Sequence, residues 1–167
     1  MIAFMHAKRA LRQVLGCLAI VVAASLAPLS AVPREIFAGP VDAVVERVID
    51  GDTLAVRARI WLGQELAVVV RVRGIDAPEA RAACPAERAL AARAAAYLAT
   101  ATQTGRVTLT DISGGKYYGR VLARVTTAEG RDVAAALLAA RLARPYSGEA
   151  RAPWCANVAQ PGLAAAD

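Results

Sequence analysis

The chain has 167 residues, which is the length of one ordinary domain and too short for two. Hydrophobic residues make up 57% of it and charged residues 20%, and this balance excludes a disordered chain. Three cysteines and one histidine exclude a disulfide-dense mini-protein and a structural zinc site, and the formal net charge is +6.

The N-terminal segment has the pattern of an export signal. Residues 1–13 carry only basic charges, residues 13–33 carry no charge, and the small Ala31 offers a cleavage site. We expect residues 1–31 to be removed on export to the periplasm or the medium. The alternative is an uncleaved membrane anchor over residues 13–33, although Pro28 interrupts it. Three of the 20 cations and none of the 14 acids lie in the signal, so the mature chain has a charge of +3.

Two cysteines would remain after the signal is removed. Cleavage takes away Cys17 and leaves Cys84 and Cys155, an even pair in an exported protein. A disulfide between them would close a loop of roughly 70 residues and stabilise the fold by about 4 kcal/mol in the chain-entropy model. We expect this disulfide, and the alternative is two unpaired thiols.

Residues 40–156 read as one domain, and residues 157–167 read as a flexible tail. The predicted elements are strands over 43–49, 54–59 and 65–73, a helix over 85–101, strands over 106–112 and 120–127, and a helix over 133–142. Five short strands with a helix between the third and the fourth suit a small Greek-key barrel. We therefore expect an oligonucleotide-binding (OB-fold) barrel carrying helices, an α+β architecture.

Acidic residues gather in two turns. One turn contains Asp50 and Asp52, and the other contains Asp76 and Glu79. Carboxylates at the ends of adjacent strands can converge, and a divalent cation such as Ca²⁺ would then offset their repulsion. Taken alone, however, the first turn also reads as a polar hairpin turn and the second as a strand exit before a helix.

Two arginines and a loop suit the chemistry of a phosphate group. Arg71 and Arg120 offer planar guanidinium groups that match the charge of a phosphodiester, and Glu79 could orient or deprotonate water. Lys116 and Tyr118 precede Arg120 in a loop that could hold a phosphate and stack a base. The alternative is that the arginines are solvated strand residues and the loop is an ordinary hairpin turn.

These motifs together resemble the staphylococcal nuclease (thermonuclease) family over roughly residues 42–155. The resemblance is carried by the segments Val48-Ile49-Asp50-Gly51-Asp52-Thr53, Val70-Arg71-Val72-Arg73-Gly74-Ile75-Asp76-Ala77-Pro78-Glu79, Tyr118-Gly119-Arg120-Val121-Leu122-Ala123 and Leu142-Ala143-Arg144-Pro145-Tyr146. It implies a five-stranded OB-fold barrel and a Ca²⁺-dependent nuclease that leaves 3′-phosphate ends on DNA or RNA. It also implies that Asp52, Asp76 and the main-chain carbonyl of Ala77 hold the metal.

The resemblance assigns further roles by motif. Arg71 and Arg120 would stabilise the five-coordinate phosphorus, Glu79 would act as general base or position the water, and Tyr118 would contact the nucleotide. Single-stranded DNA or RNA is the expected substrate. No stable protein partner is implied, and we expect a monomer. A membrane would be involved only through the N-terminal segment.

The sequence departs from the family pattern at several positions. Ala77 stands where the best-known member has Thr, Lys116 where many members have Asp, and Tyr117 where Lys is common. The last helix of the family is also short or absent here, and the disulfide could compensate by tying the tail to the first helix. The alternatives to a nuclease are a catalytically weak or inactive OB-fold module that binds nucleic acid, and a structural domain tethered to the envelope.

Overall fold

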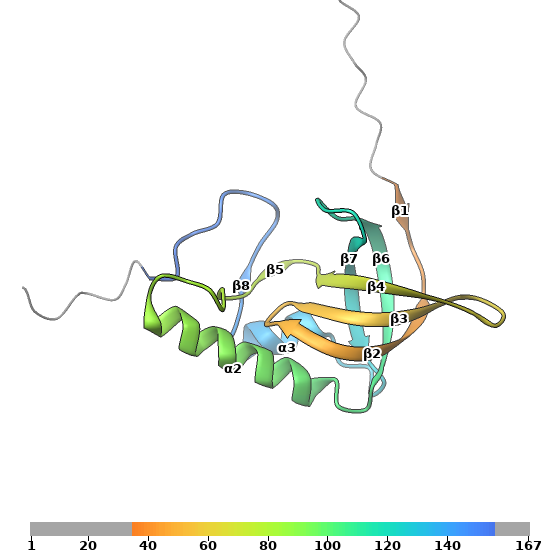
Figure 1. Ribbon diagram of the computed structural model, residues 1–167, viewed down its shortest axis with the longest axis horizontal. Helices are drawn as coiled ribbons and strands as arrows, with labels where there is room; N and C mark the ends of the chain where they lie inside the picture. The colour runs from red at the N-terminus through yellow and green to blue at the C-terminus, as the bar shows by residue number, and fades with distance from the viewer. Residues whose placement is uncertain (1–34, 156–167) are drawn as a thin grey trace, which may run out of the picture. The chain divides into compact units, whose positions relative to one another are not determined.

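Five strands close into a barrel in the computed structural model, which describes residues 35–155 (Figure 1). These strands are β2 (Val41–Asp50), β3 (Thr53–Trp61), β4 (Gln64–Val72), β6 (Arg106–Gly114) and β7 (Arg120–Thr127). Their order is β6–β2–β3–β4–β7, and β7 pairs again with β6, which closes the ring. Of these pairings, only that of β4 with β7 is parallel. The predicted five-stranded barrel is confirmed.

The two predicted terminal segments lie outside the described residues. These are the signal over residues 1–31 and the tail over residues 157–167. Within the described part of the chain, no helix is long and apolar enough to cross a membrane. Export, cleavage and anchoring therefore stay predictions.

Two helices pack against the barrel. Helix α2 (Pro85–Ala101) has the predicted bounds, and Pro85 suits its first turn because that position needs no backbone donor. Helix α3 (Val133–Ala139) begins as predicted, with the Asp132 carboxylate accepting a bond from the backbone of Ala135. Its predicted end at residue 142 is wrong. Arg141 takes a left-handed conformation with φ of 56°. Because glycine is the usual residue at such a helix end and is absent here, the sequence does not indicate where the helix stops.

Three strands of two residues each were not predicted, because a two-residue strand has no readable alternation. They are β1 (Ile36–Phe37), β5 (Ile75–Asp76) and β8 (Arg144–Pro145). Strand β1 extends the sheet beside β6, whereas β5 and β8 form a separate antiparallel pair. The pair matters for the site because it places Arg144 opposite Asp76.

Aliphatic side chains fill the core between the barrel and the helices. Leu54 and Val70 come from the barrel, Leu98 from α2 and Leu137 from α3, and all four are fully buried. The core cluster of the described residues consists of Ala, Val, Leu and Ile, as the scarcity of aromatics predicts. Helix α2 packs against β2, and the turn that follows β2 lies against this helix (Figure 1).

Candidate active site

The β2–β3 turn carries the first pair of acids and is packed tightly under helix α2. The Asp50 carboxylate accepts a bond of 3.1 Å from the backbone N–H of Asp52, which closes the turn. A Cβ at Gly51 would lie 2.6 Å from the Cβ of Ala94 and 2.9 Å from that of Ala77. Only glycine leaves room for this approach, so the turn is fixed between α2 and the segment after β5.

Asp52 is a buried carboxylate held by three donors. Its Oδ1 accepts bonds from the Thr53 hydroxyl at 2.9 Å and from Arg71 Nη1 at 2.8 Å, and its Oδ2 accepts from the Ala77 N–H at 3.0 Å. Burial raises the pKa of Asp52 to about 7; Arg71 opposes this rise and the neighbouring charge of Asp50 adds to it. This carboxylate therefore lies where a further positive charge would be favourable.

Arg71 joins the two acidic turns. Strand register places it opposite Thr53, next to Asp52. Its fork donates to Asp52 through Nη1 and to Asp76 Oδ1 through Nη2 at 3.1 Å, and the side chain is only 11% exposed. The predicted convergence of the two turns is thus present: two nearly buried carboxylates share one guanidinium group.

Asp76 also binds two residues from the C-terminal end of the described chain. Arg151 Nε lies 3.0 Å from Asp76 Oδ1, and the Trp154 indole N–H donates to Asp76 Oδ2 at 3.4 Å. Sequence reasoning missed both residues. They lie in a stretch without regular structure, and their only signal was the nearness of Trp154 to Cys155.

Glu79 lies at the edge of this cluster. Its side chain is 55% exposed, and its carboxylate pairs with Arg151 Nη1. Its backbone N–H donates to the Glu87 carboxylate at 3.1 Å, which links the loop to the first turn of α2. Arg151 therefore bridges Asp76, at the end of β5, and Glu79, in the loop that follows this strand.

Arg120 begins β7 and points to the same barrel face as Arg71. In the parallel register, Arg120 pairs with Val69 and Leu122 with Arg71, and paired residues share a face. The guanidinium carbon of Arg120 lies 4.6 Å from the Tyr117 ring centroid, a cation–π contact. Its buried Nε has no hydrogen-bond partner among the described residues. A buried donor of this kind suits an incoming acceptor such as a phosphate oxygen.

The loop before Arg120 presents its remaining predicted residues to solvent. Tyr118 is fully exposed, and the Lys116 ammonium lies 5.7 Å from the Tyr117 ring centroid. The structure thus leaves both side chains accessible. Their roles in binding a nucleotide stay predictions.

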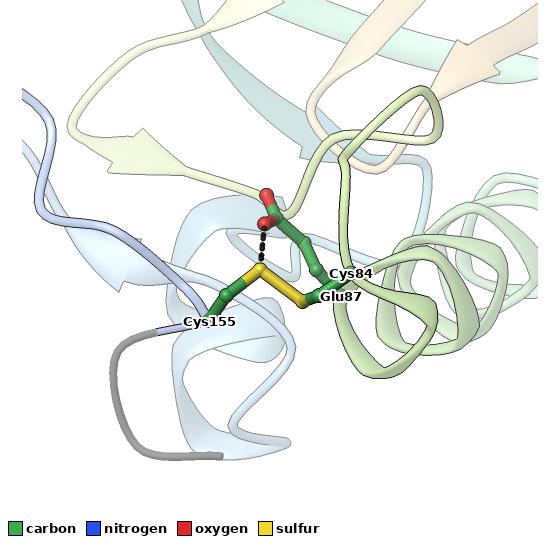
Figure 2. Close-up of side chains that lie close together, drawn as sticks. All are labelled: Cys84, Glu87 and Cys155. Carbon is green, nitrogen blue, oxygen red and sulfur yellow. Dashed lines mark hydrogen bonds between the residues drawn. A yellow bond between two sulfur atoms is a disulfide. The ribbon is translucent and has the colours of Figure 1, made fainter. Parts of the chain in front are cut away.

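The predicted disulfide joins Cys84 to Cys155, and Glu87 lies beside it (Figure 2). Glu87 Oε2 is 3.1 Å from Cys155 Sγ, but a disulfide sulfur carries no proton, so this contact is one of packing. For the same reason these three side chains do not form a metal site while the bond is intact, because neither sulfur is a thiolate. The predicted metal ligands lie elsewhere, at Asp52 and Asp76.

The chemical type of the acidic side chains at the two turns suits a hard divalent cation. Asp52 and Asp76 supply carboxylate oxygens, the ligands that Ca²⁺ and Mg²⁺ prefer, and Asp50 adds negative charge nearby. A separate hollow of about 260 Å³ lies between β2, β3 and β6, and no predicted site residue lines it. The assignment of the site therefore rests on converging charge and not on a cavity.

A comparison with protein families gives a match that covers part of this site. The model of the family described as staphylococcal nuclease homologue matches residues 69–158, more than half of the chain. The match includes Arg71, Asp76 and Glu79, and it begins after the turn that carries Asp52. A search of curated proteins gave no match.

Proposed function

The chain belongs to the staphylococcal nuclease homologue family, whose members are usually metal-dependent nucleases, and we propose that it hydrolyses phosphodiester bonds of DNA or RNA with Ca²⁺. The observation that carries the proposal is the meeting of the two acidic turns at Arg71. Asp52 and Asp76 are 3% and 7% exposed at their side chains, and both bond the same guanidinium group. An arrangement that concentrates buried negative charge beside cations suits a metal-assisted phosphoryl reaction.

The metal ligands in this proposal are Asp52, Asp76 and the carbonyl of Ala77. When bound, Ca²⁺ would supply a Lewis acid that polarises the phosphate. The Thr53 hydroxyl and the Ala77 N–H hold the Asp52 carboxylate in one orientation. The fixed orientation of the Asp52 carboxylate supports its proposed role as a ligand.

The remaining chemistry falls to Glu79, Arg71 and Arg120. Glu79 would accept a proton from the attacking water or hold that water in line with the phosphorus. Arg71 and Arg120 would stabilise the negative charge that develops on the phosphoryl oxygens, each worth about 3 kcal/mol by analogy with donors of an oxyanion hole. Cleavage of the bond between phosphorus and the 5′ oxygen would leave a 3′-phosphate and a 5′-hydroxyl.

The cellular setting is part of the same proposal. The Cys84–Cys155 disulfide suits an oxidising compartment, as does the predicted export signal over residues 1–31. Single-stranded DNA or RNA would bind at the face that carries Arg120, with Tyr118 and Lys116 accessible beside it. We propose an exported enzyme that acts as a monomer.

The test is cleavage of a labelled single-stranded DNA and a labelled RNA, with Ca²⁺ and with a chelator. We expect cleavage only with Ca²⁺, and 5′-hydroxyl ends that a kinase labels without prior dephosphorylation. Glu79→Gln should abolish most of the activity, whereas Glu129→Gln, at an exposed turn carboxylate, should not. Cleavage that persists in chelator would contradict the mechanism. Salt-sensitive binding without cleavage would identify a binding module instead.

A further inference from the structure

A C-terminal strap, defined here as residues 146–155, passes beside the proposed active site. It leaves β8, passes β5 and ends near the start of α2 (Figure 1). Two of its side chains reach the acidic cluster: Arg151 pairs with Asp76 and Glu79, and Trp154 donates to Asp76. The strap thus adds a third arginine to a site that already has Arg71 and Arg120.

Besides the disulfide, polar contacts hold the strap: Arg151 and Trp154 contact the acids, and the Tyr146 N–H donates to the Gly74 carbonyl at 3.0 Å. The Arg144 guanidinium stacks on Trp154, 3.7 Å from the ring centroid, and it also donates to the carbonyl of Pro153 at 3.3 Å. Residues 147–153 are exposed and form no helix or strand. Ordering a segment costs conformational entropy, and burial of apolar surface normally offsets this cost. These exposed residues offset little of it. The bond between Cys155 and Cys84, at the start of α2, supplies that restraint covalently.

Glu79 needs such a restraint more than the other acids do. Asp52 and Asp76 are nearly buried, whereas the Glu79 side chain is 55% exposed. Among the described residues, Arg151 is the one partner of the Glu79 carboxylate. A glutamate side chain in solvent samples several rotamers. If such a side chain must lie next to a reacting atom, the reaction is slower when the position of the side chain is not fixed.

The charges in the cluster favour the same arrangement. Asp76 and Glu79 would repel each other if both were ionised and unbridged. One guanidinium group contacts both, with Nε on Asp76 and Nη1 on Glu79. Because its fork is planar, Arg151 sets the two carboxylates in one orientation relative to each other, which a lysine would do less well.

We propose that Arg151 is a positioning residue that fixes the Glu79 carboxylate beside Asp76, and that the Cys84–Cys155 disulfide makes this positioning depend on oxidation. The inference rests on the proposed function. A dithiol would reduce the bond by transferring two electrons and two protons, which gives two cysteine thiols and the cyclic disulfide of the reagent. The strap would then leave the cluster, and Glu79 would lose its partner.

The first experiment separates positioning from general stability. Arg151→Ala should lower kcat about 10- to 100-fold with little change in KM, because binding of the substrate does not need Glu79 to be fixed. Arg151→Lys should restore part of the loss. In a Glu79→Gln background, Arg151→Ala should cause no further loss. Arg131→Ala removes an exposed arginine of the β7–α3 turn and serves as the matched control, with unchanged kcat.

The second experiment tests the disulfide. Dithiothreitol should lower the kcat of the wild type by about the same factor as Arg151→Ala, well below the unfolding temperature and with unchanged circular dichroism. The Cys84→Ser/Cys155→Ser variant should show the lowered kcat and no response to reductant. A readout without activity comes from Trp154 fluorescence in a Trp61→Phe background, since the chain has two tryptophans. Reduction should shift this emission to the red.

The outcomes separate the inference from the function it rests on. If the wild type does not cleave with Ca²⁺, the proposed function fails and the inference fails with it. If the wild type cleaves and Arg151→Ala cleaves equally well, only the inference is overturned. A rise in kcat on reduction or in Arg151→Ala would also overturn it, because the strap would then block the site. Additive losses in the Glu79→Gln background would overturn the positioning role.

Discussion

The buried carboxylate of Asp52 should make the metal-free protein less stable as the pH rises. Its pKa is about 7 in the folded state and 3.8 in a solvated reference, so folding favours the protonated form. A difference of about 3 pKa units at 1.36 kcal/mol each corresponds to about 4 kcal/mol of folding free energy. The stability from the protonated form is present below about pH 4 and is lost as the pH rises to about 7.

Asp52→Asn removes this dependence because an amide does not titrate. Between about pH 4.5 and about pH 8.5, the unfolding free energy of Asp52→Asn should gain about 3 kcal/mol relative to the wild type. The absolute difference at any one pH also contains the lost bond to Arg71. The change with pH is therefore the quantity that isolates the carboxylate.

The assay is urea unfolding of both proteins in chelator, followed by circular dichroism across this pH range. Asp42→Asn is the matched control, because Asp42 is exposed at the opposite end of β2. The control should keep a constant difference from the wild type. The reasoning is refuted if the difference for Asp52→Asn also stays constant within about 0.5 kcal/mol, or if it changes in the opposite direction.

Three further predictions concern metal, packing and the disulfide. Ca²⁺ at about 100 times its dissociation constant should raise the unfolding free energy by about 2.7 kcal/mol, and Asp76→Asn should abolish this gain in thermal melts. Gly51→Ala should destabilise the fold by about 1–3 kcal/mol in urea, because its Cβ would lie 2.6 Å from that of Ala94. Cys84→Ser/Cys155→Ser should cost about 4 kcal/mol in the chain-entropy model for a bridge with a separation of 71 residues, measured by the same unfolding curve.

The barrel was predictable because its signals are local. Alternating apolar residues mark each long strand, the Asp-Gly pair marks the β2–β3 turn, and Pro85 marks the start of α2. The end of α3 lacks such a signal, because Arg141 adopts the left-handed conformation that is usually found at glycine. Strand β5 is set by its pairing with β8, about 70 residues later, and pairing at that distance leaves no trace in a two-residue segment.

The meeting of Arg71 with the two acids was predictable for a similar reason. Alternation along β4 puts Val70 and Val72 in the core and Arg71 on the other face, and a short turn brings Asp52 to the same end of the sheet. The raised pKa of Asp52 was not predictable. It depends on burial beneath α2, which the sequence of the turn does not encode.

The strap lay beyond sequence reasoning because nothing local specifies its path. Arg151 is 72 residues from Glu79, and the segment around it has no periodicity to place it. A strand or helix would reach this position by burying an apolar face, but residues 147–153 stay exposed. The path of the strap is instead fixed at its end, where Cys155 bonds to Cys84. The two cysteines predict this bond, but they do not predict that the bond holds Arg151 beside the acidic cluster. A tail tied covalently can thus bring a charged side chain to an acidic site while most residues of the tail remain exposed. Removing the bond should therefore affect that side chain before it affects the barrel.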